Sequence, residues 1–164
     1  MIKRLSIAIC LLAIMGSAVW AQTPKNTSTP GTMSAVQDKK SLYARLGGYD
    51  AIAAFVDDLL PRLLNDKRLG VYWKGKCTDS LRKDRQLIVD FLCSAFGGPV
   101  QYLGRDMKTS HDGLHITDEE WDLFVGHVVV TLKNLGIAGR EYDDVMAATL
   151  GLKSDVVERS HAIA

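Results

Sequence analysis

The sequence is poor in cysteine and has no cluster of basic residues. Only three of its 164 residues are cysteines, and neither a CxxC nor a CxxCH motif occurs. This excludes a thioredoxin-like redox site and a covalent c-type haem site. Lysine and arginine number 20 against 19 acidic residues, and they are spread along the chain. A nucleic-acid-binding protein needs a concentrated basic surface, so we expect no nucleic-acid partner.

The sequence also lacks the sustained alternation of apolar and polar residues that is typical of β-strands, and it contains no internal repeat. Apolar side chains recur at intervals of three and four residues, as they do on one face of a helix. The clearest helix start is a capping box formed by Thr117 and Glu120, whereas Pro61 is expected to kink its helix or leave it irregular. The pattern predicts an all-α fold, with helices over residues 41–46, 52–64, 78–96, 117–135 and 141–152.

The one long uncharged run lies at the front of the chain. Lys3 and Arg4 precede it, and it extends from Leu5 to Ala21, ending in small residues. This pattern predicts a secretory signal peptide over residues 1–21, and hence export across the inner membrane to the periplasm. The alternative is a retained membrane anchor, although the run is slightly shorter than the roughly 20 residues that cross a bilayer.

The rest of the chain divides into three parts. Residues 22–40 are polar, with proline and few large apolar side chains, which predicts a flexible linker. The helical pattern predicts a domain over 41–153 and a tail over 154–164. The two cysteines that remain after signal cleavage, Cys77 and Cys93, are expected to be free thiols, although an oxidising compartment permits a disulfide.

One stretch combines a glycine hinge with a single histidine. Gly97-Gly98-Pro99 and then Gly104 release the backbone from regular helix, so the chain can bend across a bound group. His111 then needs only a short helical turn to aim its ring. A nearby backbone carbonyl that accepts from one ring nitrogen would fix the tautomer of this histidine.

These motifs, taken in order, resemble the group I truncated haemoglobins, which have the 2-on-2 globin fold. The similarity covers roughly residues 41 to 152 and is carried by the following segments: Ser41 to Gly48, Gly97-Gly98-Pro99, Tyr102 to Met107, His111, Ile116-Thr117, Trp121 and Gly126-His127. The resemblance implies a globin that binds haem b with His111 as the iron ligand. A diatomic gas (dioxygen, carbon monoxide or nitric oxide) would then bind at the opposite face.

The resemblance also implies which side chains surround the haem: Leu60, Leu87 and Ile88 on the gas-binding side, Tyr72 and Trp73 as an aromatic wedge, Phe91 and Met107 against the ring, and Tyr102, Arg105 and Lys108 at the propionates. Many relatives carry hydrogen-bonding side chains at the positions of Leu60 and Ile88. Without such a donor we expect weaker retention of dioxygen. The resemblance also places Asp84 toward the cofactor, but an ionised carboxylate only accepts hydrogen bonds. The alternative is that Asp84 faces solvent at the mouth of the pocket.

Other interpretations stay open at this point. His111 and His115 are four residues apart and could form a zinc pair, or His111 could be purely structural. His127 is expected to be a packing or surface residue. The globin could instead act as a nitric oxide dioxygenase or a peroxidase-like enzyme with a redox partner protein. A haem-free helical binding module is the third alternative.

Overall fold

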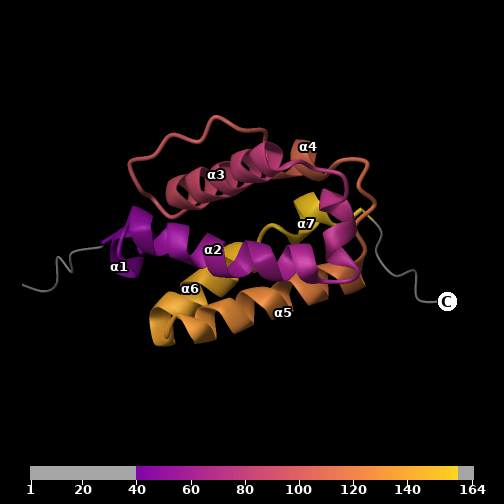
Figure 1. The fold of residues 1–164 in the computed structure, drawn as a ribbon. Coiled ribbons are helices and arrows are strands. Elements are labelled where there is room, and N and C mark those ends of the chain that lie inside the picture. Colours follow the sequence, from indigo (N-terminus) through magenta and orange to yellow (C-terminus); the bar gives the residue numbers. More distant parts are fainter. Residues whose placement is uncertain (1–39, 159–164) are drawn as a thin grey trace, which may run out of the picture. The chain divides into compact units, whose positions relative to one another are not determined.

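Eight helical segments and no strand make up the part of the chain that the computed structural model describes, residues 40–158 (Figure 1). In chain order they are α1 (Leu42–Leu46), α2 (Tyr49–Asn65), the 3₁₀ helix η1 (Leu69–Trp73), α3 (Thr78–Ala95), α4 (Met107–His111), α5 (Asp118–Asn134), α6 (Gly139–Leu150) and α7 (Lys153–Val156). The predicted all-α fold is confirmed. None of these helices is long and apolar enough to cross a membrane. The predicted signal peptide and all of the predicted linker except Lys40 lie outside the described residues.

Helix α2 is the central element of the fold and packs against α3, α5 and η1 (Figure 1). Its buried side chains recur every three or four residues, so they form one apolar face: Ile52, Phe55, Val56, Leu59, Leu60 and Leu63. Val89 and Cys93 of α3 and Leu132 of α5 meet this face and are fully buried. Burial of each large apolar side chain contributes roughly 1.5–3 kcal/mol, so this contact supplies much of the stability.

Helix α2 continues through Pro61 as a single helix, although the sequence predicted a kink or an irregular turn there. Proline lacks the N–H that would bond to the carbonyl of Asp57. Both Pro61 and Asp57 are exposed, so water can serve the carbonyl that loses its partner. The missing hydrogen bond therefore lies on the outer face of the helix, away from the core.

The Gly97-Gly98 pair lets helices α1 and α3 come close together. A Cβ atom on Gly98 would lie only 2.5 Å from the ring of Tyr43 and 2.8 Å from the carbonyl oxygen of Cys93. The backbone N–H of Tyr43 donates to the carbonyl of Phe96 at 2.9 Å. Glycine is thus required at this position because α1 packs directly against the end of α3.

The packed fold extends past residue 153, which the sequence predicted to be the last residue of the domain. Val156 in α7 is buried together with Ile116 and Trp121. The N–H of Glu158 donates to the carbonyl of Ile116 at 3.0 Å, and α7 packs against α4. The first residues of the predicted tail are therefore part of the packed domain.

Candidate functional site

A cavity of about 410 Å³ lies among α2, η1, α3, α4 and α5, with further walls from α6 and α7. This volume is in the range of cofactor sites. Most of its lining side chains are apolar or aromatic. The exceptions, apart from two tyrosines, are Lys76, Asp84, Ser110, His111, Glu120 and Thr149.

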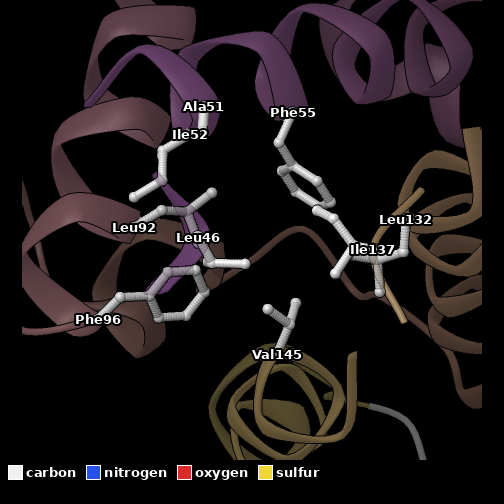
Figure 2. A pocket seen from close by; sticks show the side chains of 9 residues that line it. All are labelled: Leu46, Ala51, Ile52, Phe55, Leu92, Phe96, Leu132, Ile137 and Val145. Carbon is white, nitrogen blue, oxygen red and sulfur yellow. The ribbon is translucent and has the colours of Figure 1, made fainter. Parts of the chain in front are cut away.

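Figure 2 shows a second and much smaller void, of about 20 Å³, between α1, α2, α3, α5 and α6. All nine side chains that line it are apolar. Phe55, Leu92, Phe96 and Val145 line both spaces, so the void lies next to the large cavity. A water molecule in the void would find no polar side chain to bond with, which indicates a packing gap rather than a binding site.

His111 is the last residue of α4, and its half-buried side chain lines the large cavity. Its Nδ1 lies 2.7 Å from the carbonyl oxygen of Met107. A carbonyl can only accept a hydrogen bond, so Nδ1 carries a proton, and in the neutral imidazole Nε2 keeps its lone pair. Asp106 begins this short helix by accepting from the N–H of Thr109 at 2.8 Å. The sequence-based expectation of a carbonyl partner for His111 is confirmed.

Tyr72, at the edge of the cavity, is held by the beginning of α5. Its hydroxyl donates to Oε2 of Glu120 at 3.0 Å, and the same oxygen accepts from the N–H and hydroxyl of Thr117. Burial, with this carboxylate beside it, raises the pKa of Tyr72 to about 12, so the phenol stays a donor. Burial alone would raise the pKa of Glu120, but the hydrogen bonds from Thr117 and Tyr72 outweigh it and lower that pKa.

Helix η1, which carries Tyr72 and Trp73, is fixed at its start by Asp66. Oδ1 of Asp66 accepts from the N–H groups of Arg68 and Leu69 at 2.8 and 3.0 Å. Oδ2 lies 2.9 Å from Nε2 of His127 on α5. The hydrogen bond from His127 and the two backbone donors lower the pKa of Asp66 to about 2. His127 therefore acts in packing, as the sequence indicated, and supports one wall of the cavity.

Lys76 and Asp84 form an ion pair at the cavity. Nζ of Lys76, in the turn that follows η1, lies 2.5 Å from Oδ2 of Asp84 on α3. Both residues line the cavity. The sequence pointed to Asp84 but not to Lys76, whose one signal is its position two residues before the start of α3.

Nine of the eleven residues that the resemblance assigned to the haem line this one cavity: Leu60, Tyr72, Trp73, Leu87, Ile88, Phe91, Tyr102, Met107 and His111. The structure does not bring Arg105 and Lys108 into it, since both are exposed and neither is among its lining residues. Cavity residues that the sequence analysis did not assign to the site include Leu59, Leu63, Glu120, Trp121 and Leu152. Most of these residues lie on helix faces that the sequence predicted to be apolar. The sequence did not indicate that these faces would line the cavity.

His115 does not act together with His111. It has a positive φ of 55° and lies outside the cavity lining, with Nδ1 3.0 Å from a carboxylate oxygen of Glu158. Within residues 40–158, no group of three or more histidine, cysteine or acidic side chains gathers to hold a metal ion. This arrangement disfavours a zinc pair. Cys77 is exposed and Cys93 buried, both as free thiols.

The cavity residues fit a haem group. A porphyrin needs flat apolar walls, and its iron needs a neutral imidazole whose second nitrogen is fixed by a hydrogen bond. The cavity supplies aromatic and aliphatic walls, and His111 offers Nε2 because Met107 holds Nδ1.

Comparison with known proteins agrees with this geometry. Residues 41–157 match the model of the bacterial-like globin family. A group 1 truncated haemoglobin from Chlamydomonas moewusii is 33% identical over 71% of this chain and 68% of its own length. One from Mycolicibacterium paratuberculosis is 31% identical over 71% of this chain and 83% of its own.

Solved structures give the same result. The truncated haemoglobin of Tetrahymena pyriformis, in the Fe(III) form, superposes with a TM-score of 0.66 at 26% identity, over 73% of this chain and 100% of the other. A 2/2 haemoglobin from Synechococcus, in the cyanomet state and with covalently attached haem, gives 0.65 at 28% identity, over 73% and 99%. This chain belongs to the bacterial-like globin family, among the group 1 truncated haemoglobins.

Proposed function

We propose that this protein binds haem b through His111 and takes a diatomic gas, such as dioxygen, carbon monoxide or nitric oxide, at the opposite face of the iron. Membership of the globin family supports haem binding in general. The observation that carries the proposal is the hydrogen bond between Nδ1 of His111 and the carbonyl of Met107, which turns Nε2 into the available ligand.

The chain's own residues suit this role. A hydrogen bond at Nδ1 makes Nε2 more basic and fixes the ring orientation, so the imidazole is prepared to ligate iron. Leu60, Leu87 and Ile88 form an apolar wall of the cavity, and without a hydrogen-bond donor among them we expect ferrous iron to oxidise more easily. When bound, the haem supplies the iron that coordinates the gas.

The test is reconstitution of the purified apoprotein with haemin, followed by the ferrous carbon monoxide difference spectrum. We expect a sharp Soret difference in the wild type and in the control His115→Ala, whose ring lies outside the cavity. In His111→Ala the difference should disappear or shift. A wild type that binds no haem would contradict the proposed function. A His111→Ala spectrum identical to that of the wild type would contradict ligation of the iron by His111 but not haem binding itself. Haem b, unlike haem c, should be extracted by acidified acetone.

We also propose that the protein works in the periplasm, after cleavage behind Ala21. The support is the basic start and uncharged run of residues 1–21. Expression of the full chain in a Gram-negative host tests this, with fractionation and intact-mass analysis. A mature protein that begins at Gln22 in the periplasmic fraction is the expected result. A full-length protein in the membrane fraction would contradict it.

A further inference from the structure

The large cavity contains a single side chain with a permanent positive charge. Of the lysine and arginine residues in the described range, only Lys76 lines it. The neighbouring wall of α2 and α3 is formed by apolar side chains such as Leu60, Leu87 and Ile88. The Lys76 side chain is 39% exposed, but its apolar neighbours leave it less screened by water than a lysine on an open surface.

The backbone fixes where this lysine stands. Gly75, with a φ of +83°, turns the chain after η1, and the N–H of Lys76 donates to the carbonyl of Trp73 at 3.1 Å. Helix α3 starts two residues later, at Thr78. The base of the Lys76 side chain is therefore held between two elements that both contribute to the cavity.

Asp84 fixes the other end of the side chain. It lies on the face of α3 that also presents Leu87, Ile88 and Phe91 to the cavity, since these residues follow it by three, four and seven positions. The 2.5 Å contact between Nζ of Lys76 and Oδ2 of Asp84 thus anchors the ammonium over the α3 wall.

The pair leaves hydrogen-bonding capacity for a ligand. An ammonium has three N–H donors, and Asp84 takes one of them, whereas an ionised carboxylate offers none. The side chains of Lys76 and Asp84 are 39% and 24% exposed. Ion pairs with this exposure stabilise a fold only marginally, so the effect of the pair falls mainly on what enters the cavity.

We propose that Lys76 selects for small anionic ligands at the haem iron, with Asp84 as its positioning residue. The ammonium donates a hydrogen bond to an anion such as azide, and in the ferrous protein to the partially negative oxygen of bound dioxygen. This inference rests on the proposed haem function. It revises the expectation, drawn from Leu60 and Ile88, that the gas-binding side lacks a donor.

The test is titration of the ferric, haem-loaded protein with azide at neutral pH. Lys76→Met keeps the length of the side chain but removes the charge, and we expect azide affinity to fall tenfold or more. Asp84→Asn keeps a carbonyl oxygen that accepts from Nζ of Lys76, so the ammonium stays in place, but it removes the compensating negative charge and should raise azide affinity severalfold. Lys83→Met is the matched control, because Lys83 is an exposed neighbour on α3 that does not line the cavity. It should stay within twofold of the wild type.

The proposal predicts opposite changes in azide affinity for Lys76→Met and Asp84→Asn, which distinguishes it from a purely structural role of the pair. If Lys76 and Asp84 only brace the fold, breaking the pair from either side has the same effect on azide affinity, and that result would overturn the proposal. Faster haem loss from Lys76→Met with unchanged azide affinity would also overturn it, because it would assign the lysine to a propionate.

Two further measurements complete the design. Carbon monoxide is neutral, so its affinity for the ferrous protein should be the same in all four proteins, and the apoproteins should unfold at similar temperatures. A wild type that binds no haem would remove the proposed function and this inference together. A haem-loaded wild type whose azide affinity is unaffected by Lys76→Met would remove this inference only.

Discussion

The two internal spaces of this protein share four lining residues, yet they differ in kind. The small void meets only apolar side chains. The large cavity adds Lys76, His111 and Glu120, and each has a partner: Asp84, the Met107 carbonyl, and Tyr72 with Thr117. Helix packing alone therefore leaves a dry gap. A binding site arises where partnered polar groups are added to an apolar wall.

The largest effect that separates the two spaces is expected from Leu132→Ala. Leu132 is fully buried and lines only the small void. Because the change enlarges a void lined only by apolar side chains, it should lower the free energy of unfolding by about 2–5 kcal/mol. Urea unfolding of the apoprotein measures this. The haem spectrum should stay that of the wild type. A loss of haem would show that packing around the small void and haem binding in the large cavity are not independent.

The same change in the large cavity should have the reverse profile. Leu87 lines only that cavity and is 43% exposed. Leu87→Ala should therefore change the unfolding free energy of the apoprotein by less than about 1 kcal/mol. It should speed haem loss about fivefold, because it removes roughly 1 kcal/mol of apolar contact with the haem. Transfer of haem to an excess of another apoglobin gives the rate. A loss of unfolding free energy as large as that of Leu132→Ala would contradict the distinction between the two spaces.

Replacing Asp66, which holds one wall of the large cavity, should have the smallest effect of the three at neutral pH and should change how stability depends on acid. The pKa of Asp66 is lowered to about 2 by His127 and the backbone of η1, against about 3.9 in an unfolded chain. Its stabilising contribution is thus present above pH about 4 and is lost as the pH falls toward about 2.

Asp66→Asn should therefore be less stable than the wild type at pH 7 and should lose less stability on acidification. Thermal unfolding between pH 7 and pH 2.5 measures both slopes. Asp58, whose pKa the Arg62 guanidinium lowers to about 2, is left in place, so some acid dependence should remain. Parallel curves for the two proteins would contradict the role given to Asp66.

The long helices could be predicted from the sequence because their apolar faces repeat over many turns. The capping box at Thr117 and Glu120 appears as expected. Helices α4, η1 and α7 have only four or five residues, too few for a periodic signal. Their structure depends on individual contacts instead: Asp66, just before η1, holds the start of that helix, and Ile116 holds the backbone just after α7.

The site was predictable to the extent that it follows the motifs. His111 and the aromatic residues before α3 could be found because their order along the chain matches a known pattern. Lys76 could not, since its importance comes from meeting Asp84 eight residues later across a turn. Arg105 and Lys108 are exposed and do not line the cavity, so their contact with the propionates stays a prediction.

The C-terminal segment has a consequence for how the protein is made. Leu152 and Val156 line the cavity, and Glu158 bonds to the loop that follows α4. These residues follow every other wall of the cavity along the chain, so a nascent chain has those walls before it has this one. The cavity therefore has all its walls only after residues 152–158 have left the ribosome.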